Sequence, residues 1–187
     1  MAETCDISTI QSKLSSYKRR TLAATPRVAA VLLLLIPSED GFRVILTKRV
    51  RTLDSHGGEV SFPGGSVDSG ESLCGAVLRE TCEEIGLCGD SVRLLGMLDD
   101  EISRWGHRVT PFVGVAESAD FRIQESEVEQ IYDVPLDHFI SKTTYWTEVW
   151  FRGDDHRTVH FYKWQRDIVW GLTALIINKF TDILAKE

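Results

Sequence analysis

The chain has 187 residues, 43% of them hydrophobic, which is enough for one folded domain with its own core. Disorder is therefore excluded as its dominant state. Acidic residues outnumber basic ones by 28 to 21, so the net charge is −7 and the isoelectric point is about 5.3. This charge argues against a general nucleic-acid binder, which needs a basic surface, and we expect no nucleic acid among the partners.

The longest apolar run bounds the relation to membranes, and the cysteine spacing bounds the redox state and the metal chemistry. The longest apolar run is Val28 to Ile36, whereas a membrane-spanning helix needs about 20 residues. We therefore expect a soluble protein with no membrane partner. The four cysteines, Cys5, Cys74, Cys82 and Cys88, have no CxxC spacing, so we expect reduced thiols in an intracellular protein and no zinc site.

The first segment predicts a helix over about residues 6–18, because Ile7, Ile10, Leu14 and Tyr17 recur at helical spacing. A transit peptide is the alternative, suggested by four basic residues and weakened by early acidic ones. The basic residues are Lys13, Lys18, Arg19 and Arg20. No secretory signal is expected, and the C-terminal residues 184–187 do not resemble a peroxisomal address. The expected location is the cytoplasm, with mitochondria as the alternative.

The next segments predict strands and one final helix. Val28 to Ile36 fits a strand buried on both faces, and Phe42 to Lys48 fits its antiparallel partner across a turn at 38–41. Further expected strands are Val92 to Leu98, Val109 to Ala116, Glu148 to Arg152 and Thr158 to Trp164. Ile168 to Lys186 has a helical period and closes the chain as a helix. No repeat or linker divides the chain, so we expect one domain over 1–187.

A glycine-rich loop over 57–70 leads into a glutamate-rich helix, expected at about 69–85. Asp68 and Glu71 have the spacing of a capping box, and Gly86 is a typical stop signal. On a helix, Glu80, Glu83 and Glu84 share one face. The apolar side chains that should pack this helix on the domain lie opposite, and they are Cys74, Leu78, Thr81, Cys82 and Ile85.

Three carboxylates on one helix face repel one another unless a cation binds there. Their hard oxygen ligands favour Mg²⁺ or Mn²⁺, and the absence of His and Cys on that face argues against zinc. Arg79 lies one turn before Glu83 and is placed to pair with it. The alternative is a solvated glutamate-rich surface without a ligand.

The spacing of this segment, residues 65–87, resembles the signature of the Nudix hydrolases. The matching residues are Gly65, Glu71, Arg79, Glu80, Glu83, Glu84, Gly86 and Leu87. The resemblance implies an α/β fold, with an α/β/α sandwich around a mixed sheet. It also implies that Glu80, Glu83 and Glu84 bind the metal and act in catalysis with Arg79, and that Glu71 braces the loop. Such a site neutralises a pyrophosphate and activates or positions water.

Residues 46–65 also resemble an extra motif of the coenzyme A pyrophosphatase subgroup, as do 127–136 and 170–174. Two positions depart from these patterns: Asp54, where the subgroup usually has Arg, and Thr81, where the general signature expects an apolar residue. The residues expected to contact substrate are Lys48, Arg49, Arg51, His56, Glu59, Gly64 and Gly65.

Lys48, Arg49 and Arg51 form a basic cluster near the loop, suited to the 3′-phosphate of coenzyme A, or else serve as solubilising charges. His56 fits a ligand contact and a loop hydrogen bond equally well. Three carboxylates outside the helix are candidates for the general base: Glu59, Glu127 and Glu129.

The function implied by the resemblance is hydrolysis of the pyrophosphate bond of coenzyme A and acyl-CoA to 3′,5′-ADP and 4′-phosphopantetheine or its acyl form. Mg²⁺ or Mn²⁺ is the expected cofactor, and the partners are this small-molecule substrate and, as an open possibility, a second copy in a homodimer. One alternative is a Nudix pyrophosphatase for ADP-ribose, NADH or another nucleoside diphosphate derivative. The other is a non-catalytic Nudix sensor, which the complete set of helix glutamates disfavours.

Overall fold

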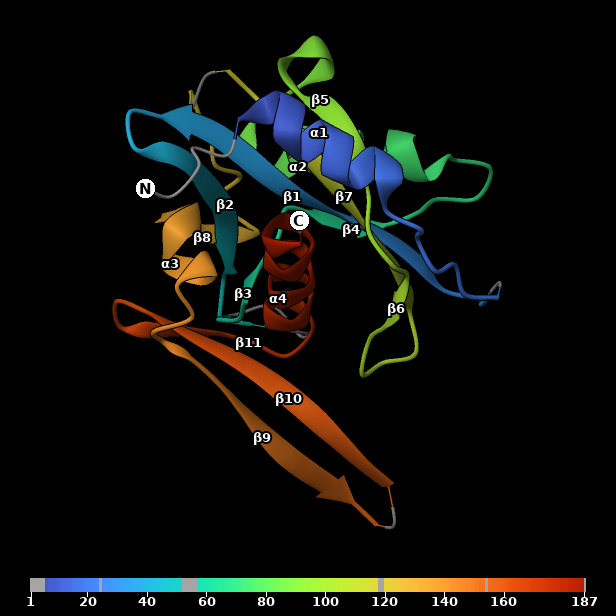
Figure 1. Ribbon diagram of the computed structural model, residues 1–187. Helices are drawn as coiled ribbons and strands as arrows, with labels where there is room; N and C mark the ends of the chain where they lie inside the picture. The colour runs from blue at the N-terminus through green and yellow to red at the C-terminus, as the bar shows by residue number, and fades with distance from the viewer. Residues whose placement is uncertain (1–5, 24, 52–56, 118–119, 154, 187) are drawn as a thin grey trace.

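The computed structural model describes residues 6–23, 25–51, 57–117, 120–153 and 155–186 (Figure 1). The helices are α1 (Ile7–Ser16), α2 (Leu73–Ile85), the short α3 (Leu136–Ile140) and α4 (Gly171–Ala185). The strands are β1 (Val28–Ser38), β2 (Gly41–Arg49), β3 (Val60–Ser61), β4 (Gly64–Ser66), β5 (Arg93–Met97), β6 (Glu101–Ile102), β7 (Arg108–Val115), β8 (Val128–Pro135), β9 (Tyr145–Arg152), β10 (Asp155–Trp164) and β11 (Asp167–Trp170).

A mixed sheet forms the centre of the molecule. Its strands follow the order β3-β2-β1-β7-β5, with β4 beside β1, β6 beside β7 and β8 beside β2. β1 runs parallel to β7 and antiparallel to β2. Leu33 and Leu35 of β1 pack with residues of α1, α3 and α4, whereas Leu32 and Leu34 pack with residues of α2. Both faces of β1 are therefore buried, and the predicted α/β/α arrangement is confirmed.

A second sheet, β11-β10-β9, extends from this body as a long hairpin, which lies at the bottom of Figure 1. One face of this sheet joins the main core through Tyr162 and Val169, which are almost completely buried. None of the described helices is long and apolar enough to cross a membrane.

Most predicted elements are present with shifted ends. The N-terminal helix is confirmed as α1, where the Asp6 carboxylate accepts a hydrogen bond from Thr9 N at 2.7 Å and Ile10 and Leu14 are buried. The predicted strands correspond to β1, β2, β5, β7, β9 and β10. β8 was missed, because its buried side chains Val128, Tyr132 and Val134 are separated by irregular polar gaps.

The predicted start of the last helix is wrong. Residues 167–170 form β11 and pair with β10, and α4 begins only at Gly171. The Asp167 carboxylate accepts hydrogen bonds from Lys48 Nζ, at 3.1 Å and 3.3 Å, and from the Tyr132 hydroxyl. These contacts tie β11 to β2 and β8, and a local helical period does not reveal them.

The prediction that all cysteines are reduced is also wrong. Cys82, near the end of α2, and Cys88, just after it, form a disulfide. Cys74 is a free, exposed thiol, and Cys5 lies outside the described residues. The helix stop at Gly86 reverses the chain direction, and this turn brings two cysteines six positions apart into contact although they show no recognisable spacing.

A buried carboxylate fastens the segment after α1 to the main sheet. Asp100 is almost completely buried and accepts hydrogen bonds from Thr110 Oγ1 at 2.6 Å, from Leu22 N at 3.0 Å and from the Arg19 guanidinium. Burial alone would raise the pKa of Asp100, but these hydrogen bonds outweigh it and lower the pKa. Charged Asp100 therefore stabilises the folded state.

We expect Asp100→Asn to lower the free energy of unfolding by about 1–3 kcal/mol at pH 7, because it weakens these buried hydrogen bonds. A group with a lowered folded pKa stabilises fully above its unfolded pKa, so the difference from wild type should shrink as the pH falls below about 4. Urea unfolding at pH 7 and at acid pH measures both effects. Asp90→Asn, at an exposed position, is the control, and an equal loss at all pH values would contradict the assignment.

Candidate functional site

Helix α2 carries the glutamates and begins later than predicted. The Ser72 hydroxyl accepts a hydrogen bond from Gly75 N at 2.9 Å and caps the helix, so the start at residue 69 is wrong. Glu71 instead closes a turn before the helix, where its carboxylate accepts a hydrogen bond from Asp68 N at 3.1 Å. The helix ends at Gly86, as predicted, in the left-handed conformation with φ of 78°.

The packing face of α2 agrees with the prediction only in part. Thr81 and Ile85 are buried as expected, and partly buried Leu78 packs against the core. Cys74 is exposed and Cys82 only partly buried, whereas Ala76 and Val77, which were not expected, are buried. The helix is thus rotated relative to the expected orientation. In this orientation Glu80 and Glu84 face β4.

Glu84 is the most enclosed of the three helix glutamates, with 2% of its surface exposed. Its Oε2 accepts a hydrogen bond from Gly64 N at 3.0 Å, and its Oε1 lies 3.4 Å from Arg49 Nη1. Burial raises the pKa of Glu84 to about 7, although the Gly64 amide and Arg49 oppose this shift. A helix residue, a loop amide and a strand arginine therefore meet at one point.

Glu80 lies against the same loop. A side chain at Gly65 would place its Cβ 2.5 Å from the Glu80 carboxylate, and one at Gly64 would place it 2.4 Å from the Ala30 carbonyl oxygen. Both glycines are required because the loop passes between β1 and the carboxylate. Burial raises the pKa of Glu80, with Arg79 opposing the shift.

Arg79 connects the carboxylates. It donates to Glu71 from Nε and Nη2, both at 3.0 Å, and from Nη1 to Glu80 at 3.0 Å and to Glu83 at 3.1 Å. The pairing with Glu83 has the i,i+4 spacing seen in the sequence. Glu83 is the outermost of the three helix glutamates, with 57% of its side chain exposed.

The expected basic cluster does not form. Lys48 is buried, and its Nζ lies 3.1 Å from Asp167 and 3.6 Å from Glu129. Arg49 points to Glu84 instead, because neighbouring side chains on a strand face opposite ways. Arg51, after the end of β2, is exposed. His56 lies outside the described residues.

The three candidates for the general base have different surroundings. Glu59 pairs with Arg104 at 2.9 Å, and Glu129 pairs with Lys48. Glu127 raises the pKa of both Glu80 and Glu84 through its negative charge. The Glu127 carbonyl accepts a hydrogen bond from Val50 N at 2.9 Å, which holds the start of β8 beside the end of β2.

Arg104 was missed by the sequence analysis. It lies in the turn between β6 and β7, 45 residues after its partner Glu59. No local pattern marks it, because its contact with Glu59 forms only in the folded chain.

The carboxylates have the donor chemistry for Mg²⁺ or Mn²⁺. All three offer hard oxygen ligands. Burial, and to a smaller extent the negative charge of Glu80, raises the pKa of Glu84, and a divalent cation beside these carboxylates would oppose this shift. In the described part of the chain, however, no three such side chains are gathered around one metal position. Arg79 pairs with Glu80 and Glu83, and Arg49 pairs with Glu84. The positive charges of these two arginines therefore lie where a metal ion would bind.

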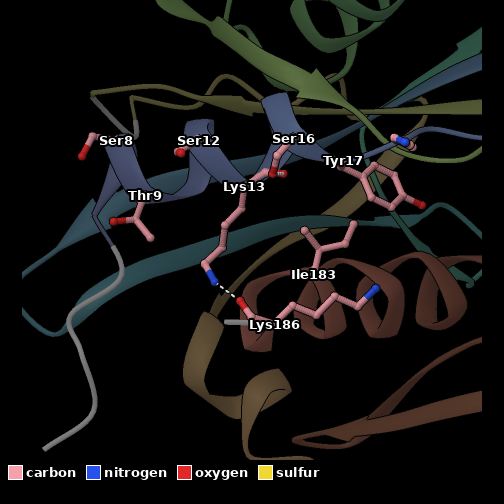
Figure 2. A pocket seen from close by; sticks show the side chains of 9 residues that line it. Ser8, Thr9, Ser12, Lys13, Ser16, Tyr17, Ile183 and Lys186 are labelled. Carbon is pink, nitrogen blue, oxygen red and sulfur yellow. Dashed lines mark hydrogen bonds between the residues drawn. The ribbon is translucent and has the colours of Figure 1, made fainter.

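A groove of about 780 Å³ lies elsewhere, between α1 and the end of α4 (Figure 2). Serines, Lys13 and Lys186 line it, and Lys13 Nζ donates to the Lys186 carbonyl across it. None of the predicted site residues contributes to this groove, so it takes no part in the site.

Comparison with known proteins assigns the family. The model of the NUDIX domain matches residues 25–151. The uncharacterized Nudix hydrolase NudL of Photorhabdus laumondii is 39% identical over 163 residues, which cover 86% of each chain. NudL of an Enterobacter species is 38% identical over 156 residues, covering 82% of this chain and 80% of its own length.

A likeness of fold alone extends to a solved structure. The crystal structure of a MutT/nudix family protein from Enterococcus faecalis is 15% identical, covers 97% of this chain and 70% of that chain, and has a TM-score of 0.53. The family match spans β1 to β9, including the glycine loop and α2. The chain therefore belongs to the Nudix family and is a Nudix hydrolase.

Proposed function

We propose that this hydrolase cleaves the pyrophosphate bond of coenzyme A and acyl-CoA, releasing 3′,5′-ADP and 4′-phosphopantetheine or its acyl form. The observation that carries the reaction class is the placement of buried Glu84 and partly buried Glu80 against the Gly64–Gly65 backbone. Such a site offers carboxylate oxygens for a divalent metal beside a glycine backbone that a phosphate can approach closely. The choice of coenzyme A depends on the resemblance of residues 46–65 to the coenzyme A pyrophosphatases.

Glu80, Glu83 and Glu84 are the residues that would hold Mg²⁺ or Mn²⁺. When bound, the metal would supply positive charge that neutralises the pyrophosphate and lowers the cost of attack by water. Arg79 orients Glu80 and Glu83, and Glu71 holds Arg79 in turn. The Gly64 amide fixes Glu84 in place. Movement of Arg79 and Arg49 toward substrate phosphate would release the carboxylates for the metal.

Arg49 has donor capacity left for a phosphate oxygen. Its Nη1 lies beside Glu84, and its buried Nε has no hydrogen-bond partner among the described residues. An unsatisfied buried donor costs free energy, so a ligand acceptor at this position would be favourable. Arg49 therefore fits a contact to the pyrophosphate better than a contact to a remote 3′-phosphate.

Glu127 is our choice for the general base. Glu59 and Glu129 are engaged in ion pairs with Arg104 and Lys48, which hold their carboxylates in place. The Glu127 carbonyl accepts a hydrogen bond from Val50 N, next to Arg49, which contacts Glu84. The negative charge of Glu127 also contributes to the raised pKa of Glu80 and of Glu84. Glu127 would take the proton from the attacking water.

ADP-ribose, NADH or another nucleoside diphosphate derivative is the alternative substrate class. Turnover of coenzyme A, ADP-ribose and NADH at equal concentration, with Mg²⁺ and with Mn²⁺, separates these substrates. Absence of turnover of all three would favour a non-catalytic sensor. We further propose a single domain over 1–187, a cytoplasmic location with mitochondria as the alternative, and a homodimer as a state to be tested by size-exclusion chromatography.

We expect Glu83→Gln to lower kcat by about a hundredfold or more, because it removes a metal ligand and a partner of Arg79. The fold should be unaffected, since this side chain is exposed. Steady-state kinetics and thermal unfolding measure the two effects. Glu39→Gln, in the exposed β1–β2 turn, is the control. Turnover near the wild-type level would show that the metal-site assignment is wrong.

Replacement of the proposed base, Glu127→Gln, should lower kcat by about 10²- to 10⁴-fold and leave KM nearly unchanged. Glu125→Gln lies two residues away in the same exposed segment and should have wild-type kinetics. If both variants behave alike, Glu127 is not the base, and Glu59→Gln and Glu129→Gln become the variants to compare.

Arg51 is the remaining candidate for the 3′-phosphate, because it is exposed while Lys48 and Arg49 are paired. Arg51→Gln should raise KM for coenzyme A by about tenfold and change KM for 3′-dephospho-CoA much less. Lys48→Gln breaks buried ion pairs, so it should lower thermal stability and affect both substrates equally. Equal changes with Arg51→Gln would show that Arg51 does not recognise the 3′-phosphate.

A further inference from the structure

An unusual group of aromatic rings covers one face of the hairpin sheet. Trp146, Phe161 and Trp170 lie directly opposite one another on β9, β10 and β11. The Trp146 and Phe161 rings stack at 5.0 Å with an angle of 9°, and the Phe161 and Trp170 rings stack at 6.4 Å with 12°. Trp150 adds a fourth ring, 5.7 Å from Trp170. We call these four residues the aromatic wall.

The aromatic wall is held in one orientation. The Glu148 carboxylate lies between two of its rings along β9 and accepts hydrogen bonds from Trp146 Nε1 at 3.1 Å and from Trp150 Nε1 at 2.8 Å. Successive residues on a strand face opposite ways, so Tyr162 and Val169, which are next to Phe161 and Trp170, carry the other face of this sheet into the core. The wall is therefore an outer, preorganised surface and not part of the main core.

A chain of contacts links the wall to the proposed site. The Arg104 guanidinium lies 5.5 Å from the Trp170 ring and 5.0 Å from the ring of Trp105. Arg104 also pairs with Glu59 of the glycine loop at 2.9 Å. The Glu59 carbonyl in turn accepts a hydrogen bond from Arg49 N at 3.0 Å, and Arg49 contacts Glu84. Arg104 therefore contacts both the aromatic wall, through Trp170, and the glycine loop, through Glu59.

Part of this aromatic surface is open. Trp150 is 47% exposed, Trp146 and Trp170 are partly exposed, and Phe161 lies buried between them with 7% exposed. Trp105, which lies beside Arg104, is 56% exposed. Neighbouring exposed aromatic rings commonly mark a binding site. A flat heteroaromatic ring suits it, because such a ring can stack on indole faces while its attached phosphates lie near a guanidinium.

We propose that the aromatic wall binds the nucleobase of the substrate while the diphosphate lies at Glu80 and Glu84. This inference rests on the proposed function, and it names the group of the substrate that the hairpin recognises. A nucleotide fits better than a second protein copy, because the wall continues through Arg104 into the glycine loop, and a ligand reaching both regions must carry a ring and negative charge together.

Trp150→Ala tests the wall, with Phe151→Ala as the matched control. Phe151 is the next residue on β9, is 76% exposed and faces the opposite side. We expect Trp150→Ala to raise KM for the adenine-containing substrates coenzyme A and ADP-ribose by about tenfold, with kcat little changed. KM for 5-phosphoribosyl 1-diphosphate, a base-free diphosphate, should not change. Phe151→Ala should resemble wild type with every substrate.

A binding measurement separates this inference from the proposed reaction. Titration with AMP in the absence of metal should quench tryptophan fluorescence in wild type and Phe151→Ala, but much less in Trp150→Ala. Trp150→Phe should restore AMP binding, which a folding defect in the hairpin would not explain. If no diphosphate is hydrolysed but AMP binding still depends on Trp150, the proposed reaction is wrong and the nucleobase site stands.

Equal AMP affinity in wild type and Trp150→Ala would overturn the inference. An equal rise of KM for the base-free diphosphate would also overturn it, because the wall would then act on the diphosphate or the fold. A change from dimer to monomer in Trp150→Ala on size-exclusion chromatography, with AMP affinity unchanged, would assign the wall to contacts between copies instead.

Discussion

The buried carboxylate of Glu84 is the constraint on which the arrangement of the site depends. Burying a charge without partners is costly, so the chain must bring hydrogen-bond donors to it. It does so with Gly64 N from the loop and with Arg49 from β2. These contacts set the rotation of α2 and its distance from β4. They also explain why Gly64 and Gly65 have no room for side chains, since the loop must pass between Ala30 and Glu80.

Charge balance is the second constraint, because the acidic side chains of α2 have few internal cations. Arg79 contacts Glu71, Glu80 and Glu83 at once. Even so, burial and neighbouring carboxylates keep the pKa of Glu80 and of Glu84 above the ordinary value. A site with this excess of negative charge is suited to a divalent metal and, through the metal, to an anionic substrate. The net negative charge of the chain therefore does not conflict with a nucleotide substrate.

The hairpin sheet is attached to the same strands that carry the proposed site. Lys48 of β2 and Tyr132 of β8 both contact Asp167 of β11, which places β11 beside the strands that end at the glycine loop. Arg104 forms a second connection, between Glu59 and Trp170. The hairpin is thus anchored to the strands that carry the site, and this geometry supports a role for the aromatic wall in substrate recognition.

Local patterns in the sequence determined much of this protein. The unbroken apolar run of β1, the period of α1 and the glycine at the end of α2 each act over a few residues, so they predict their elements without knowledge of the fold. The spacing of Glu80, Glu83 and Glu84 likewise predicted one acidic face, because the geometry of a helix is regular.

Tertiary structure decided the features that depend on contacts between distant residues. Lys48 and Arg49 are neighbours in the sequence, but Lys48 pairs with Asp167 and Arg49 pairs with Glu84. The reason is that successive side chains of a strand point to opposite faces, where they meet different residues. The same holds for the orientation of α2, for β11 in place of the start of a helix, and for the approach of Arg104 to Glu59. Burial of side chains and pairing of charges contribute more free energy than the local preference of a segment for helix or strand. The two residues of each such contact lie far apart in the sequence, so no short segment reveals the contact.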